Sequence, residues 1–141
     1  MAETIGVAVL KEQSMKVLVV EDSPKLREFI TMVLQRACFE VVTASNGQDG
    51  LVMARQEMPD VIALDSELPD LQGLEVCRLL KLDPLVRDIP VVIMTGSQDA
   101  KCLAGLEAAG AVGHIPKAFN SMTLACELLA FAKLARARLV R

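Results

Sequence analysis

From residue 16 onward, short apolar runs alternate with segments in which apolar residues recur every three or four positions. Such an alternation is typical of βαβ units, and it therefore favours a parallel sheet covered by helices. The apolar runs predict five strands, at 16–21, 40–44, 61–65, 91–95 and 112–115. The sequence thus predicts a single α/β domain of five strands, each followed by a helix.

Residues that favour a helix start follow each run. Ser23 suits the N-cap of the first helix and Pro24 suits its first turn. Five apolar residues at helical spacing then form one face of this helix: Leu26, Phe29, Ile30, Val33 and Leu34. The starts of the other helices are expected at or next to Asn46, Gly73, Ser97 and Asn120.

The first 15 residues do not fit this alternation. Ile5, Val7 and Val9 alternate weakly in the manner of a strand, but nothing marks a partner for them. The default expectation at a terminus is a flexible extension. We therefore assign residues 1–15 to such an extension and residues 16–141 to the domain.

Composition removes several classes of protein. The net charge is −3 and there is no Trp or Tyr, so nothing favours direct nucleic-acid binding. No apolar stretch is long enough to insert in a membrane, and no signal peptide is recognisable. These features favour a cytoplasmic protein.

The four cysteines are widely spaced and accompany a single histidine, which argues against a zinc site or a disulfide framework. Reduced thiols are expected. Cys38 and Cys126 are expected to be buried on helical faces. Basic residues gather near the C-terminus, where they either complement the dipole of the last helix or form a docking patch: Lys133, Arg136, Arg138 and Arg141.

Reactive side chains follow four of the predicted strands. The first strand leads into Glu21 and Asp22, the third ends in Asp65, the fourth in Thr95, and Lys117 follows the fifth. The carboxyl ends of parallel strands line the functional crevice of an open α/β sheet. Carboxylates this close repel one another unless a cation intervenes, and Mg²⁺ prefers such oxygen ligands. The pattern predicts a Mg²⁺-assisted phosphoryl site.

The chemistry of these groups suggests their roles. A carboxylate can act as a nucleophile and form an acyl phosphate. A lysine can pair as a point charge with a phosphoryl oxygen, and a threonine hydroxyl can donate a hydrogen bond to another.

Four motifs, in this order, resemble those of a response-regulator receiver domain: Val20-Glu21-Asp22-Ser23; Leu64-Asp65-Ser66-Glu67-Leu68-Pro69-Asp70-Leu71-Gln72-Gly73; Ile93-Met94-Thr95-Gly96-Ser97; and Lys117-Ala118-Phe119. The resemblance covers residues 16 to about 138. It implies a flavodoxin-like fold with strand order 2-1-3-4-5.

The resemblance also implies roles by position. Asp65 is expected to be the phosphoacceptor, Thr95 the switch hydroxyl and Lys117 the lysine that pairs with phosphate. Asp22 and Asp65 are expected to bind Mg²⁺ through carboxylates, Glu67 through its backbone carbonyl, and Glu21 through a bound water.

Three positions depart from the family pattern. Glu21 stands where aspartate is commoner, and its alternative is a solvated side chain without a role. Ala118 replaces the usual proline after the lysine, so the Lys117–Ala118 peptide is expected to be trans. His114 stands where the family carries the aromatic switch residue; it either retains a switching role or is a partly exposed edge histidine.

The resemblance implies a signalling switch. A histidine kinase or phosphotransfer protein would donate a phosphoryl group to Asp65, and the modified domain would bind a separate downstream protein, with a homodimer possible. We expect no enzymatic turnover beyond self-phosphorylation and autodephosphorylation. The alternative is a pseudo-receiver that binds proteins without phosphorylation. A haloacid-dehalogenase-like phosphatase is disfavoured because Glu67 stands where its motif needs a second aspartate.

Overall fold

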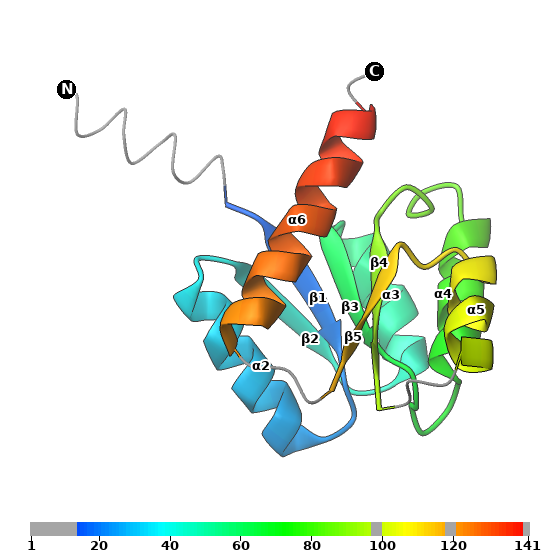
Figure 1. The fold of residues 1–141 in the computed structure, drawn as a ribbon, viewed down its shortest axis with the longest axis horizontal. Helices are drawn as coiled ribbons and strands as arrows, with labels where there is room; N and C mark the ends of the chain where they lie inside the picture. Colours follow the sequence, from blue (N-terminus) through cyan, green and yellow to red (C-terminus); the bar gives the residue numbers. More distant parts are fainter. Residues whose placement is uncertain (1–13, 97–99, 118–120, 140–141) are drawn as a thin grey trace.

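Five parallel strands form one sheet in the order β2-β1-β3-β4-β5 in the computed structural model, which describes residues 14–96, 100–117 and 121–139 (Figure 1). The strands are β1 (Lys16–Val20), β2 (Glu40–Ala44), β3 (Val61–Asp65), β4 (Val91–Thr95) and β5 (Gly113–Pro116). The helices are α2 (Pro24–Arg36), α3 (Gly47–Glu57), α4 (Gly73–Leu82), α5 (Ala100–Ala108) and α6 (Ser121–Leu139). The flavodoxin-like fold and its strand order are confirmed.

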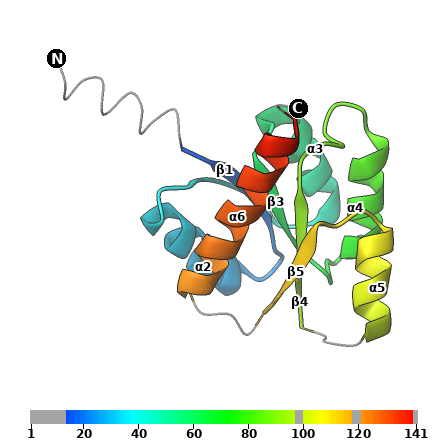
Figure 2. The same cartoon turned by 45° about the horizontal axis from the view of Figure 1, so that its top comes forward.

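The sheet separates two apolar cores, because neighbouring residues of a strand point to opposite faces. Val17 and Val19 of β1 pack with α2 and α6, whereas Leu18 and Val20 pack with α3, α4 and α5. Figure 2 shows the sheet between these two helical layers. Strands β3 and β4 are buried along their whole length. The strand ends that carry the site therefore rest on a rigid support.

The predicted helix starts hold where the structure describes them. The hydroxyl of Ser23 accepts a hydrogen bond from the Leu26 amide at 3.4 Å, and Asn46 Oδ1 accepts one from the Asp49 amide at 2.8 Å. Ser97 and Asn120 lie outside the described residues. On α2, Phe29 was expected in the apolar face but is 41% exposed. The core-facing stripe of α2 is therefore narrower than its apolar pattern predicts.

Two expectations about cysteines are wrong. Cys38 and Cys126 are exposed, and only Cys77 among the cysteines with described side chains is buried. Cys38 lies beyond the end of α2, with a positive φ of 69°, so it belongs to no helical face. Cys126 lies on α6 but on the side away from Leu124 and Leu128, which are buried.

Met15, which the sequence assigned to the amino-terminal extension, is part of the folded domain. Met15 is buried in the core, and its carbonyl accepts a hydrogen bond from the Glu40 amide at 2.8 Å. Residues 1–13, which hold most of the predicted extension, lie outside the described residues. Among the described helices, none combines the length and the hydropathy needed to span a bilayer.

Candidate functional site

The register of the sheet brings the predicted side chains to one edge. Val20, the last residue of β1, pairs with Leu64, so Glu21 and Asp65 follow on neighbouring strands. The Glu21 amide continues the ladder beyond β1 by donating to the Ala44 carbonyl at 3.0 Å. Across β3, β4 and β5, Asp65 pairs with Met94 and Thr95 with Pro116, the residue before Lys117. The predicted convergence is therefore present.

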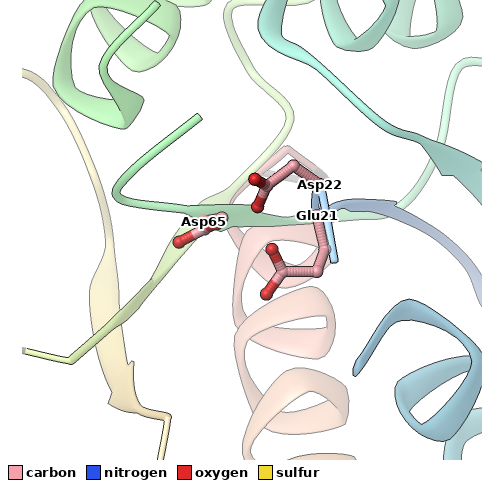
Figure 3. A group of neighbouring side chains, drawn as sticks. All are labelled: Glu21, Asp22 and Asp65. Atoms are coloured by element: carbon pink, nitrogen blue, oxygen red, sulfur yellow. The ribbon is translucent and has the colours of Figure 1, made fainter. Parts of the chain in front are cut away.

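Three carboxylates meet at this edge (Figure 3). One carboxylate oxygen from each of Glu21, Asp22 and Asp65 lies within 4.8 Å of the other two. Glu21 and Asp65 are fully buried, while Asp22 is exposed. The burial of Glu21 excludes the alternative of a solvated glutamate.

Lys117 supplies positive charge to the two buried acids. Its Nζ lies 2.9 Å from Asp65 Oδ1 and 3.2 Å from Glu21 Oε1, and its side chain is 31% exposed. Burial alone would lower the pKa of Lys117, but Asp65 and Glu21 outweigh it and hold that pKa above its ordinary value. Lys117 therefore stays protonated and paired at neutral pH.

One lysine does not satisfy both acids. Among the described residues, both carboxylate oxygens of Glu21 and the Oδ2 atom of Asp65 are buried without a well-directed hydrogen bond, although Glu21 Oε1 lies 3.2 Å from Lys117 Nζ. Burial, and then the neighbouring carboxylates of Asp65 and Asp22, raise the pKa of Glu21 to about 7. The exposed Asp22 shows the opposite effect: its pKa is lowered, mainly by its contact with the Glu21 carboxyl. The site thus holds more negative charge than its protein partners neutralise.

The remaining predicted residues surround this group. Thr95 is buried at the end of β4, and its carbonyl accepts a hydrogen bond from the Lys117 amide at 2.8 Å, which ties the two strand ends together. The Glu67 amide donates to Asp65 Oδ1 at 3.1 Å. Gly73 closes the loop after Asp65, where a Cβ would overlap the Asp65 carbonyl oxygen and lie 2.8 Å from Ser66 Cα. Only glycine fits there.

Sequence reasoning missed one residue of this site. Arg27, on the first turn of α2, donates from Nη1 to the Glu21 carbonyl at 2.9 Å and to the Asp22 carbonyl at 3.4 Å. Arg27 thereby fixes the backbone that carries two of the three acids. Its position five residues beyond Asp22, within the first turns of a capped helix, was the available signal.

Two departures from the family pattern remain predictions. His114 is exposed on the edge strand β5, which agrees with an edge histidine and does not test a switching role. Ala118 lies outside the described residues, and so does the geometry of the Lys117–Ala118 peptide.

The acidic group fits a divalent metal. Hard cations such as Mg²⁺ are bound by carboxylate and carbonyl oxygens together with water. Three such carboxylates lie close together here, and three of their oxygens are buried without a hydrogen-bond partner. A bound cation would neutralise the charge that Lys117 leaves uncompensated.

A match to a protein-family model shows which family the chain belongs to. The model described as the response regulator receiver domain matches residues 17–128. The chain belongs to this family. Receiver domains are signalling modules of two-component systems, and they bind Mg²⁺ at an acidic pocket. The recognition made from four motifs is therefore confirmed.

Known relatives of this receiver domain are of two kinds. The phosphate regulon transcriptional regulatory protein PhoB of Pseudomonas aeruginosa is 38% identical over 116 residues, covering 81% of this chain and 50% of PhoB. Protein PilH of the same organism is 34% identical over 109 residues, covering 77% of this chain and 90% of PilH. The chain thus spans about half the length of relatives such as PhoB and most of the length of others.

Solved structures of receiver domains have the same fold. The structure of the chemotaxis protein CheY4 of Vibrio cholerae superposes with a TM-score of 0.80 at 30% identity, covering 84% of this chain and 98% of CheY4.

Proposed function

We propose that this receiver domain accepts a phosphoryl group on Asp65 in the presence of Mg²⁺ and that the modification changes its affinity for a partner protein. The observation that carries the proposal is the unbalanced site: three carboxylates meet, two of them buried, and one lysine reaches both buried acids. Lys117 pairs with Asp65, and Thr95 ends the neighbouring strand β4, which supports a site where a carboxylate, a lysine and a hydroxyl act together in phosphoryl transfer.

Each residue has a role that follows from its position. The Asp65 carboxylate attacks the phosphorus of a phosphorylated histidine, a P–O bond forms, the P–N bond breaks, and the imidazole leaves with the bonding electron pair. Lys117 Nζ lies 2.9 Å from Asp65 Oδ1, so its ammonium group would also pair with an oxygen of a phosphoryl group on Asp65. The Thr95 hydroxyl would donate to a second phosphoryl oxygen. Bound Mg²⁺ supplies charge neutralisation for the incoming phosphoryl oxygens.

The metal would be held by residues already in place. The carboxylates of Asp22 and Asp65 and the backbone carbonyl of Glu67 are its proposed direct ligands. Glu21 would act through a water molecule, which its longer side chain and the absence of a hydrogen bond to its Oε2 atom permit. Arg27 would keep the Glu21-Asp22 backbone in position during binding.

The donor is proposed to be a histidine kinase or a phosphotransfer protein, and the output a separate protein that recognises the modified domain. Conversion of the Asp65 carboxylate to an acyl phosphate would take the charge of the side chain from −1 to about −2 and add phosphoryl acceptor oxygens, and this change would bias an equilibrium between two conformations. A change in self-association is a second possible output.

The test is the intact mass of the protein after incubation with acetyl phosphate. We expect a mass increase of one phosphoryl group that requires Mg²⁺ and disappears in Asp65→Asn. An adduct of equal amount in Asp65→Asn would place the chemistry elsewhere. No adduct and no Mg²⁺ binding would instead favour the pseudo-receiver, a protein-binding module that acts without phosphate.

A further inference from the structure

Asp70, an exposed residue of the loop between β3 and α4, accepts three hydrogen bonds, and two of them come from outside that loop. Its Oδ1 accepts from the Gly47 amide at 2.7 Å and from the Leu71 amide at 2.9 Å. Its Oδ2 accepts from the Gln48 amide at 2.9 Å. Gly47 and Gln48 are the first two residues of α3, 23 and 22 positions earlier in the chain. One carboxylate therefore joins the loop to a neighbouring helix.

The charge of Asp70 suits this position. The amides of Gln48 and Gly47 hold the pKa of Asp70 below its ordinary value, so the group is ionised at neutral pH. A negative charge at a helix N-terminus interacts favourably with the helix dipole. Charge-assisted bonds of this kind are shorter and stronger than neutral ones.

The loop and α3 approach so closely at Gly47 that a larger residue there would displace its neighbours. A Cβ on Gly47 would lie 3.1 Å from Asp70 Oδ1, 3.0 Å from Leu71 Cβ and 2.9 Å from Val76 Cγ2. Gly47 thus lets the loop rest directly on the first turn of α3. The side chains of Leu68 and Leu71 pack against the core from the same loop, without fixing its direction as hydrogen bonds do.

The loop held by Asp70 is the one that completes the site. Glu67 and Gln72 form an antiparallel bridge, and the Gly73 amide donates to the Ser66 carbonyl at 2.9 Å. The segment is therefore a narrow hairpin with Asp70 at its tip and Asp65 at its base. Glu67, whose amide already contacts Asp65, lies on the first arm of this hairpin.

Two side chains, Asn46 and Asp70, accept hydrogen bonds from different amides at the start of α3. Asn46 is the N-cap of α3, and its Oδ1 already accepts from the Asp49 amide at 2.8 Å. Asn46 and Asp70 thus act on the same helix start, but only Asp70 belongs to the loop after Asp65. A comparison of Asn46 and Asp70 variants can therefore distinguish an effect on the stability of α3 from an effect on the site.

We propose that Asp70 is a positioning residue of the phosphoryl site: it fixes the tip of the β3–α4 loop on α3 and so holds the Glu67 carbonyl where Mg²⁺ is bound. The inference rests on the proposed function, because it assigns a purpose to the carbonyl that the metal would use. Residues that orient metal ligands commonly change metal affinity by an order of magnitude or more when they are removed.

The experiment compares Asp70→Ala with the matched control Asn46→Ala. Both variants remove hydrogen bonds from the N-terminus of α3, so both should lower the melting temperature. Mg²⁺ binding is measured by titrating ¹⁵N-labelled protein with MgCl₂ and recording the NMR signals of the Glu67 and Gly73 amides. Hydrogen exchange of the same two amides is measured separately in the metal-free protein.

We expect Asp70→Ala to weaken Mg²⁺ binding about tenfold and to speed exchange in the loop by a similar factor. Asn46→Ala should leave the Mg²⁺ dissociation constant within about twofold of wild type. Asp70→Asn keeps one acceptor oxygen and should fall between wild type and Asp70→Ala. Saturating Mg²⁺ should restore the extent of phosphorylation by acetyl phosphate in Asp70→Ala, because Asp65 itself is intact.

Equal Mg²⁺ affinity in Asp70→Ala and wild type, or equal losses in Asp70→Ala and Asn46→Ala, would overturn the proposal and leave Asp70 as a helix cap. If wild-type protein bound no Mg²⁺, the metal part of the proposed function would fail first. The exchange measurement, which needs no metal, would then decide whether Asp70 holds the loop, and unchanged exchange would overturn that too.

Discussion

The two ends of the sheet differ in how completely their charged side chains are paired. At the amino end, Asp60 accepts from the Lys16 amide at 2.7 Å through Oδ2 and from Arg136 Nη2 at 2.7 Å through Oδ1. Lys16 Nζ also lies 3.5 Å from Glu57 Oε2. At the carboxyl end, three buried carboxylate oxygens lack a hydrogen-bond partner among the described residues. The amino end has its charges paired, whereas the carboxyl end keeps charge uncompensated.

We interpret the paired charges of the amino end as structural and the uncompensated carboxylates of the carboxyl end as a ligand-binding feature. Paired, half-exposed charges contribute modestly to stability, and the pairing of Arg136 with Asp60 gives one of the basic C-terminal residues a structural partner that neither sequence interpretation foresaw. Buried, unpaired carboxylates destabilise the fold unless a ligand compensates them. The carboxyl end is therefore the region where removing a negative charge should stabilise the metal-free protein.

The largest effect is expected from removing the single cation of the carboxyl end. Lys117→Met leaves Glu21 and Asp65 buried without a positive partner, so the free energy of unfolding should fall by about 3 kcal/mol in the presence of a chelator. Urea denaturation at pH 7.5 measures the loss. The double variant Lys117→Met/Asp65→Asn is the control, and it should recover most of the stability because one buried charge is gone. An unchanged stability in Lys117→Met would show that the site is not electrostatically strained.

A smaller effect of opposite sign is expected for Glu21→Gln. The pKa of Glu21 in the folded protein is raised from 4.5 to about 7. The folded state therefore binds the proton more tightly than the unfolded chain, and wild-type stability should fall as the pH rises from about 4.5 to about 7. Glu21→Gln lacks this dependence, so in chelator its advantage over wild type should grow by about 2 kcal/mol between pH 5 and pH 8.

Urea denaturation of both proteins at the two pH values tests this prediction. Glu57→Gln serves as the control, because Glu57 pairs with Lys16 at the amino end of the sheet. Parallel pH curves for wild type and Glu21→Gln would contradict the account of a raised pKa.

The smallest effect is expected at the amino end. Asp60→Ala removes the partner of the Lys16 amide and of Arg136, and stability should fall by about 1 kcal/mol. The loss should be the same with and without Mg²⁺, since the site is at the other end of the sheet. A Mg²⁺-dependent loss, measured by thermal unfolding, would mean that the two ends are coupled.

The fold and most of the site followed from the sequence because both depend on local signals and on one rule of topology. Apolar runs and capping residues such as Ser23 locate the elements, and parallel strands bring their carboxyl ends to one edge. Asp65, Thr95 and Lys117 could therefore be placed together before any coordinates were known.

The sequence did not predict the tertiary contacts around the site residues or the exact ends of some helices. The burial of Glu21, beside Lys117 at the end of β5, depends on packing between elements that are distant in the sequence. The contact of Asp70 with Gly47 joins residues 23 positions apart, and no periodicity reports it. Cys38 was misplaced because α2 ends at Arg36, two residues before it. Each of these depends on the exact end of an element or on packing between elements.

The central claim is that the uncompensated carboxylates at the carboxyl end form a metal-binding phosphoacceptor site. The most direct measurement is the free energy of unfolding of wild type and Asp65→Asn, in chelator and then in Mg²⁺ at ten times the wild-type dissociation constant. The account predicts a gain of about 1.4 kcal/mol for wild type and less than half of that for Asp65→Asn. No gain in wild type, or an equal gain in both proteins, would contradict it.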